Sequence, residues 1–324
     1  MFTRKELARL IIPLLIEQIL AVTVGFADSL MVAGVGEAAV SGVSLVDSVN
    51  ILLIGLFGAM ATGGAVVTSQ LLGQKNEKEA CKSGQQLLLS VLLLSLVLMA
   101  ISLFFGNNLL LLLFGRVEEE VMFHSKIYLF YTAISFPFIA VYNACAALFR
   151  SMGNSKISMI ISLIMNLINI VFNAIFIYGA GWGVAGAAIA TLISRIFAAV
   201  TMYILLHNRK HPIHIEGYRQ YRPDFALIKK ILNIGIPNGL ENSVFQIGKI
   251  IVQGMIAGLG TPAITANAVA STVSGFGTLP GSAIGLALIT VVGQCVGARD
   301  FDGVKKYTYK LMKLTYIIMA VLNA

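Results

Sequence analysis

The sequence predicts an all-α membrane protein, a polytopic bundle of membrane-spanning helices. Three observations indicate this class. Of the 324 residues, 57% are hydrophobic and only 12% are charged, about half the charged share of a soluble domain. Apolar segments of roughly 20 residues or more, the length that crosses a bilayer as a helix, recur along the chain. Lys and Arg gather in alternate breaks between those segments.

This composition excludes a soluble enzyme, a disordered chain and a disulfide-stapled secreted domain. The three cysteines are too few and too scattered for a disulfide framework or a metal site. The first apolar segment is much longer than the apolar core of a cleavable signal peptide. We therefore expect it to be the first membrane span.

Each apolar segment should be a helix, because lipid cannot satisfy open backbone groups. The expected spans are 7–33, 45–72, 85–113, 121–148, 157–178, 184–207, 228–258 and 263–296, with a ninth that begins near residue 307. The ninth span has only about a dozen apolar residues before Ala324, which is short for a bilayer crossing. We therefore expect the chain to be truncated relative to a complete protein.

The distribution of charge predicts the orientation of the bundle. Lys and Arg precede the first span and follow the second, fourth, sixth and eighth spans, whereas the breaks 34–44, 179–183 and 258–263 contain neither. The positive-inside rule places the basic side, and with it the N-terminus, in the cytoplasm. The net charge of +8 is therefore an orientation signal, and we expect no nucleic-acid partner.

An internal repeat relates the start of the chain to its end. An offset of 224 residues aligns Pro13 with Pro237, Glu17 with Glu241, Gln70 with Gln294, and Gly73 with Gly297. Six spans separate the copies, so both begin at the same face, as parallel repeats related by an axis along the membrane normal. We expect a six-helix N-lobe (1–207), a cytoplasmic linker (208–227) interpreted as a solvated connector, and an incomplete C-lobe of about three helices (228–324).

Ionisable side chains within the spans are candidate functional residues, because charge in hydrocarbon is costly. Glu17 and Asp28 fall on one face of the first helix, about 16 Å apart along its axis. Glu241 is the repeat partner of Glu17, and Lys249 follows two turns later. Structural roles remain open for all four. Glu17 and Asp28 could form helix–helix hydrogen bonds or extend to the membrane surface from the ends of their span, and Glu241 could pair with Lys249 or with a missing helix.

The fifth span carries Asn166, Asn169 and Asn173 along one stripe of its helix. Amide oxygens together with a carboxylate suit a hard cation, although asparagines also join helices in membranes. Spacing alone leaves both interpretations open. In the sixth span, Thr191 could add a hydroxyl, and the small residues of Gly183–Thr191 predict close helix approach.

Taken in order, several segments resemble the multidrug and toxic compound extrusion (MATE) family. They are Pro13 with Gly25–Val32, Gln70–Gln74, Leu148–Asn154, Asn169–Gly179, Gly183–Thr191, Gly235–Glu241 and Gln294–Gly297. The resemblance covers the whole chain. It implies two lobes that form a V and exchange organic cations for Na⁺ or H⁺.

The resemblance also implies site residues. It maps an N-lobe cation site onto Asp28, Asn169, Asn173 and Thr191, with Na⁺ as a candidate ligand of the first three. It maps a C-lobe site onto Glu241. Some relatives carry Asp at the position of Asn173, which bears on the identity of the bound ion. Glu17 lies outside the general family pattern and is a secondary candidate, as are Asn166 and Lys249.

We therefore expect a secondary active antiporter that exports small lipophilic cations by alternating access. It would be a monomeric, multi-pass protein of the bacterial cytoplasmic membrane, with a coupling ion and no cofactor, and not an enzyme. Two alternatives remain open. One is a related flippase for lipid-linked saccharides or lipids, which would need a wide basic cavity, and the other is a non-transporting fragment.

Overall fold

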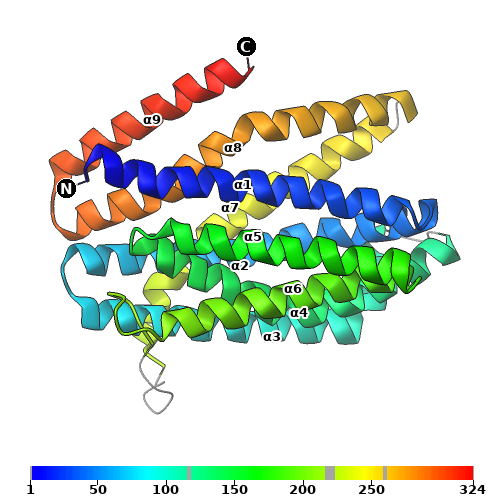
Figure 1. Cartoon of the computed structure of the whole chain (residues 1–324), viewed down its shortest axis with the longest axis horizontal. Helices are drawn as coiled ribbons and strands as arrows, with labels where there is room; N and C mark the ends of the chain where they lie inside the picture. Colours follow the sequence, from blue (N-terminus) through cyan, green and yellow to red (C-terminus); the bar gives the residue numbers. More distant parts are fainter. Residues whose placement is uncertain (1, 115–117, 216–222, 258–260, 324) are drawn as a thin grey trace.

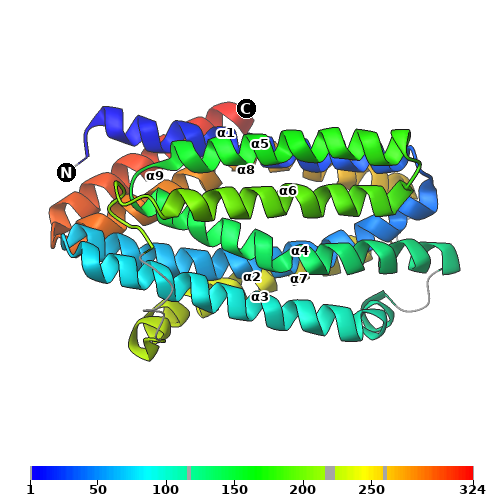
Figure 2. The same ribbon diagram turned by 60° about the horizontal axis from the view of Figure 1, so that its bottom comes forward.

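The computed structural model describes residues 2–114, 118–215, 223–257 and 261–323, which form an elongated helical bundle (Figures 1 and 2). The helices are α1 (Arg4–Ala33), α2 (Glu37–Gly73), α3 (Glu77–Phe114), α4 (Glu119–Ser151), α5 (Ser155–Asn173), the π-helix η1 (Ala174–Gly179), α6 (Gly183–Leu206), α7 (Phe225–Ala257), α8 (Thr261–Gly297) and α9 (Phe301–Asn323). Seven of the described helical segments are long and apolar enough to cross a membrane. The all-helical membrane fold is confirmed.

The helices extend beyond the spans expected from hydropathy. The second helix begins at Glu37, eight residues before the expected start, and the ninth begins at Phe301 rather than near 307. Hydropathy detects only the part of a helix that lies in lipid, whereas backbone hydrogen bonds continue into polar flanks. Helix α1, for example, starts in water with a capping box, in which Glu6 N–H donates to Thr3 Oγ1 and Thr3 N–H donates to Glu6 Oε2.

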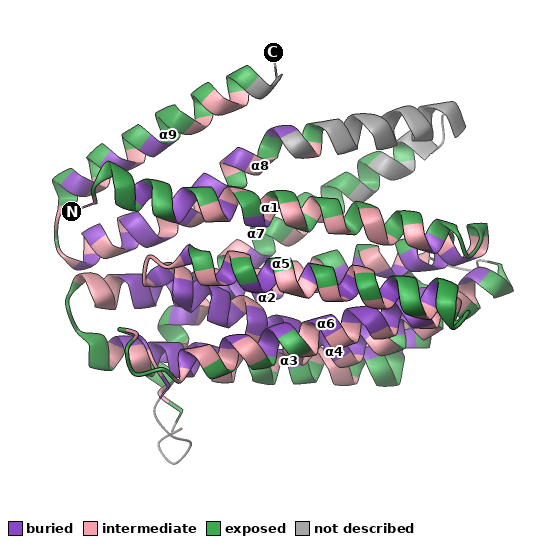
Figure 3. Ribbon diagram, in the orientation of Figure 1, coloured by how far each residue is buried: buried purple, intermediate pink, exposed green. Residues whose placement is uncertain are grey.

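Helix α4 is the centre of the first six helices and packs against α2, α3 and α6. In its most apolar stretch 78% of residues are buried, against 22% for α1, and Figure 3 shows the contrast between buried and exposed helix faces. The main hydrophobic core includes Phe57, Phe136 and Phe149, which are fully buried. Large exposed apolar side chains such as Phe104 and Leu112 cover the outside of the bundle, as expected for a surface in contact with lipid.

Helix α8 packs against α1, α2 and α4 near the end of the bundle that holds the N-terminus. There Thr290 Oγ1 donates to the carbonyl of Arg150 at 3.0 Å, and Gln294 Nε2 donates to the carbonyl of Ser151 at 2.7 Å. Nearby, the hydroxyl of Tyr307 bonds both the N–H and the carbonyl of Phe2. These contacts join α4 to α8, and α9 to the N-terminal residues, at that end of the bundle.

The described part of the 208–227 linker is not a simple solvated connector, which corrects the sequence interpretation. Ile213 and Ile215 are buried, and the side chain of Ile213 lies against Gly84 in α3. The thiol of Cys81 lies 3.5 Å from the carbonyl of Pro212. Two isoleucines are enough to pack this polar segment against the bundle. They have little effect on the average composition of the segment, so the composition does not reveal them. Residues 216–222 of the linker lie outside the described residues.

Candidate functional site

Four residues expected to form the N-lobe site meet in one hydrogen-bonded chain. Asn173 Nδ2 donates to Asp28 Oδ1 at 2.6 Å and to Asn169 Oδ1 at 3.2 Å. Asn169 Nδ2 in turn donates to Thr191 Oγ1 at 3.2 Å, and the threonine hydroxyl donates to the carbonyl of Ala187. These hydrogen bonds therefore join α1, α5 and α6 through side chains that are far apart in the sequence.

Local helix geometry places these groups. Asn169 and Asn173 are one turn apart on α5, so their amides stack along one face. The π-helix η1 begins immediately after Asn173, and short π segments are frequent at functional sites. Gly186 allows α6 to approach it closely, because a Cβ at that position would lie 2.8 Å from the Cβ of Phe176. The small-residue contact surface expected for the sixth helix is thus present at Gly186.

The chain of polar groups runs from the bundle interior to a partly open surface. Asn169 and Asn173 are 4% and 1% exposed, whereas Asp28 is half-buried. The Oδ1 atom of Asn173 is buried without a hydrogen-bond partner among the described residues. A buried acceptor without a donor is unfavourable, and carbonyl and carboxylate oxygens are suitable ligands for a hard cation such as Na⁺.

A second carboxylate, Asp47 of α2, lies beside these hydrogen-bonded side chains. It is not among the candidate residues predicted from the sequence. Asn50 Nδ2 lies 3.5 Å from Asp47 Oδ1, and the hydroxyl of Tyr128 also bonds the Asp47 carboxylate. Asp47 interacts electrostatically with Asp28. The available signal was simple: Asp47 is the only ionisable residue in the expected span 45–72.

Arg195 of α6 completes this group of charges. It donates to Ser135 Oγ at 2.7 Å and lies close enough to interact electrostatically with both Asp47 and Asp28. From its position one turn beyond the small-residue stretch Gly183–Thr191, the sequence predicts that Arg195 pairs with a carboxylate in a structural role. Helix packing alone brings it beside two acids that come from other helices.

Two secondary candidates lie outside the N-lobe chain. Glu17 accepts a hydrogen bond from Ser158 Oγ at 2.9 Å and forms an ion pair with Arg150 Nη1 at 3.4 Å. This arrangement joins α1, α4 and α5, which is the structural role left open for Glu17. Asn166 is buried, and its Nδ2 has no hydrogen-bond partner in the described structure, so it does not join the chain that contains Asn169 and Asn173.

The α7 candidates are both exposed side chains. Lys249 Nζ lies 4.8 Å from the centre of the Phe245 ring, a distance at which a cation–π interaction contributes. The ion pair considered between Glu241 and Lys249 is absent from the described contacts. The reason is the rise of the helix, because eight residues correspond to about 12 Å along its axis.

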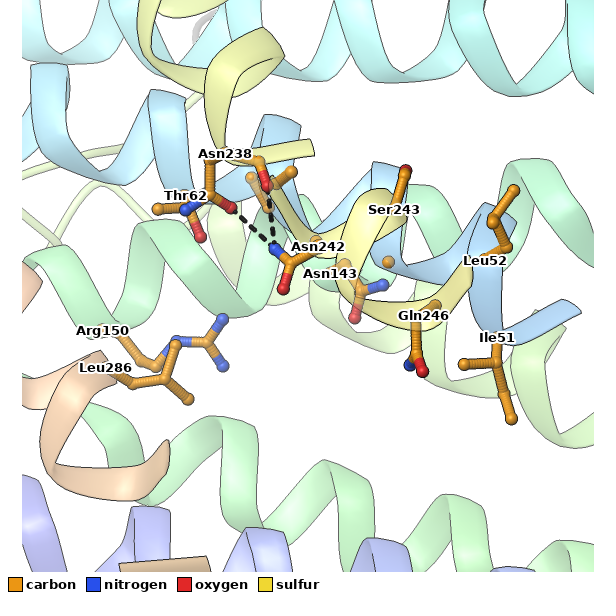
Figure 4. Close-up of a pocket in the computed structure, with 14 residues that line it drawn as sticks. Ile51, Leu52, Thr62, Asn143, Arg150, Asn238, Asn242, Ser243, Gln246 and Leu286 are labelled. Atoms are coloured by element: carbon orange, nitrogen blue, oxygen red, sulfur yellow. Dashed lines mark hydrogen bonds between the residues drawn. The ribbon is translucent and has the colours of Figure 1, made fainter. Parts of the chain in front are cut away.

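A polar cavity of about 240 Å³ lies among α2, α4, α7 and α8 (Figure 4). Its hydrogen-bonding side chains are Thr62, Asn143, Arg150, Asn238, Asn242, Ser243 and Gln246. Asn242 Nδ2 bonds the carbonyl and the Oδ1 atom of Asn238. Figure 4 shows Arg150 reaching into the space opposite these α7 amides. Apart from Arg150, these polar side chains are neutral.

Known proteins resemble this chain in sequence and in fold. A family model described as MatE matches residues 13–175 and 237–324, which is most of the chain. The chain belongs to the MATE family. Both matched regions contain candidate residues: Asp28, Asn169 and Asn173 lie in the first, and Glu241 lies in the second.

Curated MATE relatives align along nearly the whole chain. The uncharacterized transporter YisQ of Bacillus subtilis is 28% identical over 96% of this chain and 68% of its own length. The probable multidrug resistance protein YoeA of the same species is 28% identical over 98% of this chain and 70% of its own length. The chain spans 63% of a third relative, the probable multidrug resistance protein NorM of Thermotoga maritima, at 26% identity.

Solved MATE structures share the fold. A crystal structure of MATE in complex with MaL6 matches with a TM-score of 0.92 and 23% identity, over 98% of this chain and 70% of the other. An outward-facing multidrug resistance MATE family transporter matches with a TM-score of 0.90 and 24% identity, over the same shares of the two chains. At this level of identity the matches establish the helical architecture.

Proposed function

We propose that this chain is the transport unit, or part of one, of a secondary active antiporter that exports organic cations in exchange for Na⁺ or H⁺. The proposal rests on the hydrogen bonds that link Asp28 through Asn173 and Asn169 to Thr191. A half-buried carboxylate meets buried amides, one of which has an oxygen without a partner among the described residues. Such a site attracts a cation from water and holds it in a low-dielectric bundle.

The coupling follows from competition for the carboxylate. A lipophilic cation and the coupling ion would compete for the Asp28 carboxylate. Each would stabilise a different conformation of the protein. Exchange requires that each ligand bind the two conformations with different affinity. An inward gradient supplies about 2.3 kcal/mol per charge per 100 mV, which is enough to drive accumulation outside the cell.

The contacts at the N-terminal end indicate which conformation the structure resembles. In this proposal the basic residues put that end in the cytoplasm, and the α8 contacts with α1, α2 and α4 would close it. In this proposal the cytoplasmic gate is shut. The two lobes, residues 1–207 and 228–324, are joined by the linker 208–227 and would rock about this closure. Glu241 would be a second cation site, in the C-lobe.

Nothing in the described structure favours the flippase alternative. A pyrophosphate-linked lipid would require free basic side chains in the cavity. Arg150 is paired with Glu17, and Arg195 bonds Ser135 beside two carboxylates. The cavity is otherwise lined by neutral amides and hydroxyls together with apolar side chains, which do not offset the charge of a phosphate.

Reconstitution into sealed vesicles tests the proposal. The purified chain should move ethidium against its gradient when an inward Na⁺ or proton gradient is imposed. The Asp28→Asn variant should abolish this movement, and Glu37→Gln, which neutralises an exposed carboxylate at the start of α2, should retain it. Coupled flux that survives in Asp28→Asn rejects the site. Folded wild-type chain without flux supports the non-transporting alternative.

A further inference from the structure

An apolar groove of about 510 Å³ lies on the outside of the bundle, between α3 and α6. Both helices pack on α4, and Figure 2 shows α4 between them. The walls of the groove include Leu89 and Leu92 of α3 and Val200 and Tyr203 of α6, and its floor includes Pro137 and Phe138 of α4. The lining side chains are apolar apart from the hydroxyl of Tyr203. The volume is within the range of a small-molecule binding site.

The groove lies at the depth of lipid acyl chains. Helix α6 is long and apolar enough to cross a membrane, and it ends at Leu206. Tyr203 and Val200 lie about 4.5 Å and 9 Å of helix rise before that end, within the roughly 15 Å of hydrocarbon in one leaflet. Leu92 and Val200 are 37% and 47% exposed at the edge of the groove. A lipid chain can therefore enter the groove sideways from the bilayer.

Two lysines lie beyond the end of the groove at which α6 stops. Lys78 is on the same face of α3 as Leu89, because eleven residues make three turns plus about 20°. Lys210 belongs to the linker, which packs on α3 one turn from Lys78: the N–H of His214 donates to Cys81 Sγ at 3.5 Å. Both lysines are exposed, and neither forms an ion pair within the described part of the chain.

The spacing between the lysines and the groove matches the dimensions of a phospholipid. Lys78 lies about 16 Å of helix rise from Leu89, close to the depth of hydrocarbon in one leaflet. A lipid whose acyl chain lies beside Leu89 therefore has its phosphate near the level of Lys78. Tyr203, with an apolar ring and a polar hydroxyl, lies between the two levels, as is common for Tyr near a membrane surface.

We propose that this groove binds an acyl chain of an anionic phospholipid and that Lys78 and Lys210 hold its phosphate. Charge complementarity favours this occupant, because basic side chains beside grooves between membrane helices bind anionic head groups. A helix of a second copy of the chain would fill the groove without supplying a negative charge to the lysines. The lining residues are separate from Asp28 and Asn173, so lipid binding does not depend on the proposed transport.

Photocrosslinking in nanodiscs tests the lipid site. The full chain is reconstituted with a trace of phosphatidylglycerol or phosphatidylcholine that carries a diazirine at the same acyl position. Crosslinked peptides are then identified by mass spectrometry. In the wild type, phosphatidylglycerol should label α3, α4 and α6 at the groove about tenfold more than phosphatidylcholine does, because two lysines attract its phosphate.

One pair of variants tests the groove. Val200→Phe places a larger side chain at the edge of the groove and should abolish labelling there by both lipids. Ile204→Phe is the matched control, because Ile204 lies one turn further along α6, is exposed, and is not a lining residue. It should be labelled like the wild type.

A second pair of variants tests the phosphate contact. Lys78→Gln combined with Lys210→Gln should remove the preference for phosphatidylglycerol and leave labelling by phosphatidylcholine unchanged. Lys305→Gln combined with Lys306→Gln removes the same charge from exposed positions on α9 and should keep the preference. All four positions are exposed, so these variants report on the head group even where Val200→Phe does not fold.

Four results would overturn the inference. Equal labelling of the wild type by the two lipids would mean that the groove meets only bulk lipid. Labelling that persists in a Val200→Phe variant with the wild-type melting temperature would locate the lipid elsewhere. An unchanged preference in the variant of Lys78 and Lys210 would exclude the phosphate contact. Crosslinks between two copies of the chain through α3 or α6, without lipid labelling, would assign the groove to a dimer.

Discussion

Gly73 of α2 lies directly against the backbone carbonyl of Gln294 in α8. Its repeat counterpart makes the reciprocal contact, because Gly297 lies against the backbone carbonyl of Gln70. Both pairs are related by the same offset of 224 residues. Reciprocal contacts of this kind are expected where two copies of a segment cross at a local twofold axis, and a side chain on either glycine would separate the two helices.

Gly297→Ala should therefore weaken the crossing of α2 and α8. The added methyl group meets backbone rather than a flexible side chain, and overpacking of this type costs about 1–3 kcal/mol. The expected result is a lower melting temperature in detergent and a longer distance between spin labels placed on α2 and α8. Gly285→Ala is the control, since among the described residues only the adjacent positions and backbone of α8 itself come within 4 Å of a Cβ at that position. Equal behaviour of the two variants would contradict a tight crossing.

Thr191→Val should weaken cation binding while leaving the helices in place. The substitution removes the oxygen that accepts from Asn169 Nδ2 at 3.2 Å, and the buried amide then lacks a partner, at a cost of about 1–3 kcal/mol. Affinity for Na⁺ or protons, measured by titration of the purified chain, should fall by roughly tenfold or more. Thr191→Ser retains the hydroxyl and should remain close to wild type. Loss of binding in Thr191→Ser as well would indicate a steric role for the threonine methyl.

Glu17→Gln should reduce stability without reducing cation uptake at the Asp28 site. The variant removes the charge that pairs with Arg150, in a contact where both side chains are largely buried, so a cost of about 3–5 kcal/mol is expected. Thermal unfolding measures the first effect and Na⁺ or proton titration the second. Glu79→Gln, which breaks an exposed pair with Lys82, should change stability by about 0.5 kcal/mol or less. A loss of cation uptake in Glu17→Gln would return Glu17 to the functional candidates.

Ile213→Ala should destabilise the N-lobe, although Ile213 belongs to the linker. Its side chain is 1% exposed and contacts α3, and truncation of a buried isoleucine costs about 2–5 kcal/mol. A lower melting temperature and faster proteolysis near the end of α6 are the expected results. Arg209→Ala, at an exposed position three residues past α6, should have little effect. No difference between the variants would restore the interpretation of a solvated connector.

The fold was largely predictable because the bilayer makes hydropathy a direct signal. Apolar length decides where a span lies, and lipid permits only helices there. The helix ends were less predictable, as Glu37 and Phe301 show, because hydrogen bonding continues after hydropathy falls. The linker was misjudged for a related reason: two buried isoleucines have little weight in the composition of a polar segment.

The candidate site was also only partly predictable from the sequence. The sequence determined by itself that Asp28 and the α5 asparagines occupy membrane spans, because charge and amides are conspicuous against an apolar background. Only the tertiary structure decided that Asn173 bonds Asp28, that Glu17 pairs with Arg150, and that Asp47 and Arg195 lie beside the candidate cation site. Contacts between helices depend on how each helix is rotated and packed against its neighbours. That rotation is settled by the sum of many small side-chain contacts, which no single segment of sequence contains.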